Sequence, residues 1–151
     1  MKVFEIESIQ FIKKPLNEVF DFFSKPENLE KITPDSLSFN ILTPSPIIME
    51  KGRIIDYTIK ILKFSVHWRT LITSYDPPNF FVDEQIKGPY KFWHHTHIFE
   101  SKNGGVEITD KVKYIIPFGV FGKILHKLWI RRDLEKIFYY RKNVIQKYFN
   151  K

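Results

Sequence analysis

The spacing of apolar residues changes at Pro117 in this chain of 151 residues. Between residues 37 and 117, apolar and polar residues mostly alternate, a pattern typical of β-strands. After Pro117, apolar residues recur every three or four positions as far as Tyr148, which indicates a long amphipathic helix. A run of strands followed by one long helix is typical of an α+β fold.

Short segments divide the first part of the chain. Residues 3–12 alternate from the start and predict a strand, and Pro15 then suits the first turn of a helix over 15–24. A second short helix is expected over 25–34. Six further strands are predicted at 37–43, 53–62, 64–75, 80–86, 90–101 and 104–117.

The expected architecture is a helix-grip fold, formed by residues 1–151 as a single domain. A strongly twisted antiparallel sheet of six or seven strands curls. A helix from near Gly119 to near Phe149 would lie in its concave face and leave a pocket between the two. The apolar stripe of this helix is expected to pack on the sheet. It is interrupted near Arg131 and Arg132, where the helix bends or its face rotates.

Composition excludes several classes of protein. The absence of cysteine rules out disulfides, thiolate metal sites and a cysteine nucleophile, and fits a reducing cytosol. The N-terminus lacks the apolar region of a signal peptide, and no apolar run is long enough to span a membrane, so a cytoplasmic location is expected. The net charge of +7 suggests nucleic-acid binding, but lysines are scattered outside the C-terminal third, so no nucleic-acid partner is predicted.

Three of the five histidines lie close together, at His94, His95 and His97. Alternation on a strand places His95 and His97 on one face and His94 on the other. The face of His95 and His97 also carries Trp93 and Phe99, which makes it too aromatic for the solvent side. We therefore expect His95 and His97 to point inward and His94 to point outward.

The hairpin that follows brings an aspartate to the same face. Asn103 and Gly104 form the strongest short hairpin signal known in sequences. A two-residue loop places His97 opposite Asp110, whereas a four-residue loop places His95 opposite Asp110. In either register Asp110 lies on the inner face, beside the two histidines.

The strand over residues 80–86 adds further polar groups. Phe81, Asp83 and Gln85 share one face, which points inward if Phe81 does. Because buried polar groups require partners, the inner histidines with Asp83, Gln85 and Asp110 favour a hydrogen-bonded network at the floor of a pocket. A metal site using both histidines and an aspartate, and a histidine–aspartate acid–base pair, remain alternatives. The bare spacing of the two histidines is common, so no metal or other cofactor is predicted.

The aromatic content is high, at 17% with 15 phenylalanines, and indicates either an aromatic core or an apolar cavity. His67 and His126 are isolated and are expected at the surface or rim. The ligand-binding residues predicted for the cavity are Trp68, Phe81, Asp83, Gln85, Trp93, His95, His97, Phe99, Asp110, Tyr114, Leu125 and Leu128.

The C-terminal helix is basic as well as amphipathic, and its lysines and arginines are assigned to the solvated side. The alternative is contact with a protein partner or, transiently, with a membrane surface. No glycine-rich phosphate loop, nucleophile elbow or zinc-protease motif occurs in the chain.

The segments "PPNFFVDEQIKGPYKFWHHTHIFE" and "GGVEITDKVKYIIPFG", with the closing long helix, resemble the START-like or SRPBCC superfamily. The resemblance extends over nearly the whole chain, including "PLNEVFDFFSKPENLEKITP", and is similar in kind to the bacterial cyclase/dehydrase-like proteins of that group. It implies a deep apolar cavity between the sheet and the last helix. This superfold carries transporters, enzymes and sensors, so the resemblance does not name the ligand.

The expected function is the binding of a small hydrophobic or amphipathic molecule, such as a lipid, a polyketide or an aromatic compound. The first alternative is a cyclase, dehydratase or hydrolase in which His95, His97 and Asp110 supply the acid and base. The second alternative is a partner-binding module that acts through the basic helix.

Overall fold

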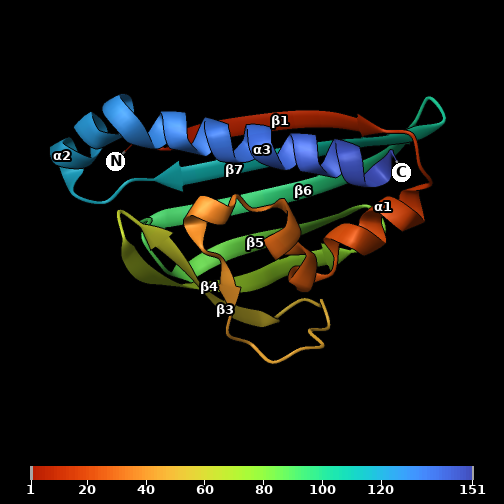
Figure 1. Cartoon of the computed structure of the whole chain (residues 1–151), viewed down its shortest axis with the longest axis horizontal. Helices are drawn as coiled ribbons and strands as arrows, with labels where there is room; N and C mark the ends of the chain where they lie inside the picture. The colour runs from red at the N-terminus through yellow and green to blue at the C-terminus, as the bar shows by residue number, and fades with distance from the viewer. Residues whose placement is uncertain (1, 151) are drawn as a thin grey trace.

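In the computed structural model, which describes residues 2–150, seven strands form one antiparallel sheet (Figure 1). The strands are β1 (Phe4–Ile12), β2 (Asn40–Ile41), β3 (Ile54–Ile61), β4 (Phe64–Asp76), β5 (Phe80–Lys87), β6 (Phe92–Lys102) and β7 (Gly105–Ile115). Their spatial order is β1-β7-β6-β5-β4-β3-β2. Strands β2 to β7 therefore follow one another as a meander, and the N-terminal strand closes the sheet beside β7.

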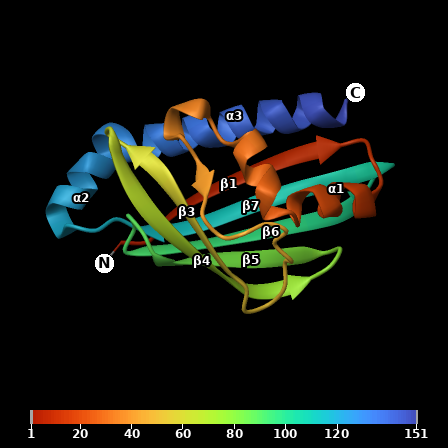
Figure 2. The same ribbon diagram turned by 60° about the horizontal axis from the view of Figure 1, so that its bottom comes forward.

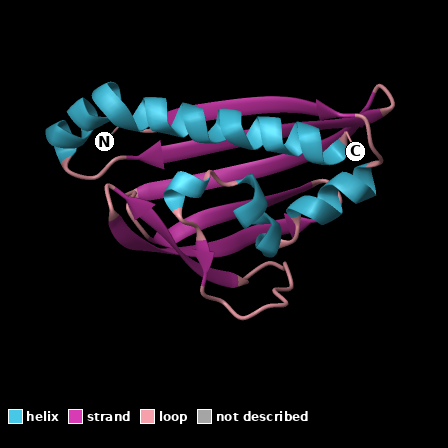
Figure 3. Ribbon diagram, in the orientation of Figure 1, coloured by secondary structure: helices cyan, strands magenta, loops and turns pink. Residues whose placement is uncertain are grey.

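The helices gather on one face of this sheet (Figure 3). They are α1 (Leu16–Phe23), the 3₁₀-helices η1 (Pro26–Ile32) and η2 (Asp35–Leu37), α2 (Gly119–Leu125), the π-helical turn η3 (His126–Ile130) and α3 (Arg131–Phe149). The last three run on as one long rod over the sheet. No helix within residues 2–150 is both long enough and apolar enough to cross a membrane. The α+β helix-grip fold expected from the sequence is confirmed.

The β3–β4 end of the sheet curls toward α2 (Figure 2). The pairing of β4 with β5 shifts register between Arg69 and Thr70, and again between Ile72 and Ser74. Such bulges bend a strand and increase its twist. The curl opens a concave face, and α3 lies across it.

The hairpin between β6 and β7 has the two-residue loop that the sequence predicts. Lys102 pairs with Gly105, and His97 lies opposite Asp110. Asn103 and Gly104 both have positive φ, of 51° and 78°, as a type I′ turn requires. This turn sets the side-chain register of both strands.

Two buried clusters hold the helices on the sheet. At the end near α1, Phe20, Phe23 and Phe99 pack ring against ring, with centroids 5.1–5.4 Å apart for the pairs that include Phe99. At the other end, Trp68 and Trp93 form a second cluster with Tyr114, Leu134 and their neighbours. Space between these clusters is left for a cavity.

The predicted strand over residues 37–43 is wrong in extent. Only Asn40 and Ile41 lie in regular register with β3, the N–H groups of Leu42 and Thr43 both donate to the Asp56 carbonyl, and residues 35–37 form a 3₁₀ turn instead. Pro44 and Pro46 follow directly. Proline has no N–H to donate to a sheet, so the pairing ends there.

The predicted packing of the apolar stripe on the sheet is also wrong for the first part of the long helix, where the stripe consists of Phe121, Ile124, Leu125 and Leu128. Phe121 and Leu128 are 73% and 68% exposed, and Ile124 is exposed as well. The π-helical turn inserts one extra residue ahead of α3, which rotates the preceding helix by about 100° relative to a regular α-helix. Gly122 and His126 consequently face the protein instead.

Candidate functional site

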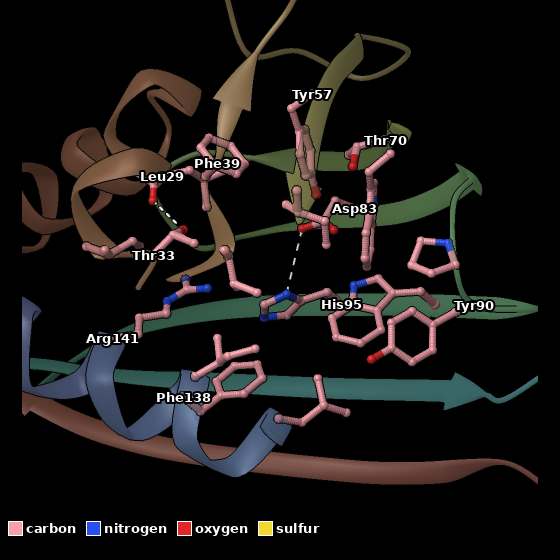
Figure 4. A pocket seen from close by; sticks show the side chains of 18 of the residues that line it. Leu29, Thr33, Phe39, Tyr57, Thr70, Asp83, Tyr90, His95, Phe138 and Arg141 are labelled. Atoms are coloured by element: carbon pink, nitrogen blue, oxygen red, sulfur yellow. Dashed lines mark hydrogen bonds and ion pairs between the residues drawn. The ribbon is translucent and has the colours of Figure 1, made fainter. Parts of the chain in front are cut away.

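A cavity of about 590 Å³ lies between the concave sheet, α3 and the short helices (Figure 4). Its wall is mainly apolar and aromatic. The elements that contribute to it include η1, β3, β4, β5, β6 and α3, so the cavity lies inside the helix grip. Its volume falls within the ~300–1,000 Å³ range of small-molecule sites.

Many of the predicted residues lie in this wall. They are Trp68, Phe81, Asp83, Trp93, His95, His97 and Leu125. The alternation of β4, β5 and β6 turns these side chains toward the concave face, whereas Leu125 reaches the cavity from the end of α2. His94 lies on the outer face, where it contacts Glu84 at 2.6 Å.

The other predicted residues do not line the cavity, and a specific contact or helix geometry explains why in each case. Gln85 holds the following turn, since its amide bonds both the N–H and the C=O of Tyr90. Phe99 packs in the aromatic cluster beside α1 and does not reach the cavity. Asp110 is buried behind the histidines, and Leu128 points to solvent because of the π-helical turn.

Tyr114 is also absent from the cavity wall, because it contacts His126, a histidine predicted at the surface or rim. The Tyr114 hydroxyl lies 2.7 Å from Nε2 of His126, and both residues are buried. The His126 ring also stacks on Phe4, with centroids 3.6 Å apart. This contact fixes the start of the long helix to β1 and β7, away from the cavity. His67 is half-buried and contacts Asp56 at 2.7 Å.

The polar part of the wall is a network of two histidines and two aspartates. His95 Nε2 lies 2.8 Å from Asp110 Oδ1, and His97 Nε2 lies 2.5 Å from Asp83 Oδ2. The two imidazole rings stack on each other with centroids 3.7 Å apart. Each hydrogen bond is diagonal across the sheet, because the residues directly opposite one another are Asp83 with His95, and His97 with Asp110.

The two aspartates are held in their ionised form. Burial raises the pKa of Asp110, but the charge of Arg141, the hydrogen bond from His95 and the nearby His97 ring outweigh it and hold that pKa well below its ordinary value. Burial likewise raises the pKa of Asp83. The bond to His97 and the nearby positive groups reverse this effect, so the pKa of Asp83 is lowered.

The two histidines differ in charge preference. Burial lowers the pKa of His97, but this ring lies between two carboxylates, at 2.5 Å from Asp83 and 3.3 Å from Asp110, and its pKa is raised overall. Burial and the charge of His97 together lower the pKa of His95. If one of the two rings takes up a second proton, His97 is therefore favoured over His95. Asp110 keeps the neutral His95 in the tautomer that leaves Nδ1 as an acceptor.

Arg141 completes the network, and the sequence analysis missed it. Its side chain comes from α3 and reaches into the cavity beside Phe138 (Figure 4). The residue is only 9% exposed. Its spacing indicates an inward position, because Arg141 shares one face of the helix with the apolar residues Leu134, Phe138 and Ile145. Assigning every arginine of this helix to the solvated side was wrong.

Within residues 2–150, the group suited to a metal ion is formed by Asp83, His95 and His97, whose ligand atoms lie within 4.8 Å of one another. Its geometry does not fit one ion as it stands. Nitrogen lone pairs lie in the ring planes, and these planes are stacked only 23° from parallel. Both nitrogens would need to lie about 2.0–2.1 Å from the same ion, which requires one ring to turn out of the stack.

Several solved structures share the fold of this chain, whereas no protein-family model and no curated protein matches it. A protein of Thermus thermophilus is 15% identical, with a TM-score of 0.71 over 93% of this chain and 96% of its own. Major latex-like protein 151 of Panax ginseng is 11% identical, with a TM-score of 0.70 over 97% of both chains. The di-domain ARO/CYC StfQ of the steffimycin pathway is 12% identical, with a TM-score of 0.76 over 98% of this chain, which spans 51% of StfQ. The chain therefore shares the helix-grip fold of these three proteins.

Proposed function

We propose that this protein binds a small hydrophobic or amphipathic molecule in the cavity under α3. The observation that carries the proposal is the internal space of about 590 Å³ with a mainly apolar and aromatic wall. Removing apolar surface from water contributes about 25 cal/mol per Å², so a lipid, polyketide or aromatic compound would gain most by entering. The ginseng latex-like protein and the di-domain ARO/CYC StfQ share this fold.

A neutral fluorescent probe tests this proposal. N-phenyl-1-naphthylamine should bind with micromolar affinity, and native mass spectrometry of the purified protein should reveal any molecule that co-purifies. Leu125→Trp narrows the cavity from its wall and should weaken probe binding about tenfold, equivalent to ~1.4 kcal/mol. Leu128→Trp is the matched control, because this side chain of the same rod points to solvent. Equal affinity in both variants would contradict a binding site in this cavity.

A second candidate function is contact with an anionic membrane surface at the α2 end of the molecule. Leu62, Phe64, Phe118, Val120 and Phe121 are all exposed there. The β3–β4 turn and α2 lie at the same end in Figures 1 and 2, and both contribute residues to the cavity wall. An apolar patch of this kind at a cavity wall suits a surface from which a ligand enters.

The charge at this end complements anionic lipid. Residues 60–66 and 118–130 contain Lys60, Lys63, Lys123 and Lys127 and no acidic residue. Each lysine near an anionic surface adds about 1 kcal/mol of attraction. Co-sedimentation with vesicles of phosphatidylglycerol should exceed that with phosphatidylcholine, and Phe121→Ser should reduce it. Sedimentation that is equal for both lipids, or unaffected by Phe121→Ser, would remove this candidate.

A further inference from the structure

Arg141 is a buried cation whose hydrogen-bonding capacity is largely unused. Its Nε is buried without a partner in the described part of the chain. The nearest carboxylate oxygen, Asp110 Oδ1, lies 3.7 Å from Nη2, which is beyond the range of a hydrogen bond. The rings of Phe23 and Phe138 flank the guanidinium at 5.7 Å and 6.0 Å. These rings hold the group in place but accept no conventional hydrogen bond.

The neighbouring carboxylates are already engaged by the histidines. Asp110 Oδ1 accepts a hydrogen bond from His95 and lies 3.3 Å from Nδ1 of His97. Asp83 Oδ2 is bonded to His97. Buried donors in proteins are nearly always satisfied. Nε is closed off from the cavity, so the Nη N–H groups of Arg141, which lines the cavity wall, are the donors that a ligand can reach. They therefore point to an acceptor supplied by the ligand.

The charge of the network argues for a neutral acceptor. Arg141 supplies one fixed positive charge against the two carboxylates of Asp83 and Asp110, and a proton on His97, which lies between these carboxylates, brings the group no further than neutral. A ligand carboxylate would leave this buried group with a net negative charge, and an unbalanced charge in an apolar interior is strongly disfavoured. A carbonyl oxygen accepts hydrogen bonds from the guanidinium without changing the balance.

We propose that Arg141 donates hydrogen bonds to a neutral carbonyl oxygen of the ligand and thereby orients an otherwise apolar molecule in the cavity. This inference rests on the proposed binding function and narrows it to ketones, esters and similar neutral oxygen-bearing compounds. The carbonyl lies against α3 at the level of Phe138, and the apolar body extends along the aromatic wall of the sheet.

Three naphthalenes of similar shape test the head-group preference by calorimetry. They are 2-acetylnaphthalene, 2-isopropylnaphthalene and 2-naphthoate, which carry a carbonyl, a hydrocarbon and a carboxylate at the same position. The ketone should bind about tenfold tighter than the hydrocarbon, as one good hydrogen bond to a charged donor provides. It should also bind tighter than the carboxylate. A tighter carboxylate, or no difference among the three, overturns the proposal.

Variants assign the preference to Arg141. Arg141→Met keeps the apolar stem and should bring the ketone to within about twofold of the hydrocarbon, whereas Arg132→Met, an exposed arginine of the same helix, should keep the tenfold preference. Arg141→Lys retains a charge beside Asp110 if the methionine variant fails to fold, and should lose at least half of the preference because the planar fork is gone. A preference that survives these Arg141 variants overturns the proposal. Probe binding with no head-group preference refutes only this inference, whereas no binding of the probe or of any naphthalene refutes the proposed function as well.

Discussion

Replacing Asp110 by alanine tests whether the network under the cavity stabilises the fold. The carboxylate accepts a hydrogen bond from His95 at 2.8 Å, and lies 3.3 Å from His97 and 3.7 Å from Arg141. It is itself buried. Its removal leaves two imidazoles and a guanidinium in the interior with a single carboxylate, Asp83, beside them.

The expected loss follows from this arrangement. Removing one partner of a buried ion pair costs about 3–5 kcal/mol, since the remaining charge is left uncompensated. Asp110→Asn keeps the volume and one acceptor oxygen but removes the charge. Its loss should therefore be smaller, near the ~1.5–3 kcal/mol of a hydrogen bond that involves a charged group.

Urea unfolding followed by circular dichroism measures both variants. With a slope of about 1–3 kcal/mol/M for a small protein, Asp110→Ala should lower the unfolding midpoint by at least ~1 M. Asp76→Ala is the control, because Asp76 is exposed and its carboxylate accepts one long hydrogen bond, at 3.3 Å from the Asn79 amide. It should change the free energy of unfolding by no more than about 0.5 kcal/mol.

The test depends on the order in which the three variants lose free energy of unfolding. The network would be energetically unimportant if Asp110→Ala lost no more than Asp76→Ala. A loss in Asp110→Asn as large as that in Asp110→Ala would locate the stabilisation in the charge alone, contrary to the hydrogen bonds described above.

Three other outcomes follow from the structure. The pKa values of Asp83 and Asp110 are lowered in the folded state, so their contribution to stability is complete above the pKa of the unfolded chain. The free energy of unfolding should therefore fall as pH drops below about 5, and it should fall less steeply in Asp110→Asn. A flat profile in urea titrations from pH 3 to 7 would contradict this. Gly122→Ala should lose ~1–3 kcal/mol despite its better helix propensity, because a Cβ there would lie 2.0 Å from the backbone oxygen of Pro117; a raised melting temperature would count against this close approach. Tyr114→Phe removes a buried hydrogen bond to His126 and should lower the free energy of unfolding in urea by about 0.5–1.5 kcal/mol, whereas no loss would contradict a stabilising bond between these two side chains.

Several features of the site could be predicted from local sequence alone. The period of two along β6 decides that His95 and His97 share a face, and Asn103-Gly104 decides that His97 lies opposite Asp110. Both depend on neighbouring residues and on one turn geometry. The switch to helical spacing after Pro117 likewise predicts the long helix over Gly119–Phe149.

Other features depend on segments far apart in the chain. Alternation cannot show that the hydrogen bonds run diagonally, because side-chain rotamers are chosen by packing against Phe81 and the adjacent ring. The exposure of Phe121 and Leu128 follows from a single π-helical turn, which no apolar period marks.

The sequence by itself therefore determined the order of the elements along the chain, the face that His95, His97 and Asp110 share, and the presence of a long closing helix. These properties are set by backbone periodicity and turn geometry within a few residues. Only the tertiary structure decided that Arg141 lies inside, beside Asp110, and that Tyr114 bonds His126 instead of lining the cavity. The rotation of a helix on a sheet is settled by packing and charge pairing across the whole domain, so its consequences cannot be read from either segment alone.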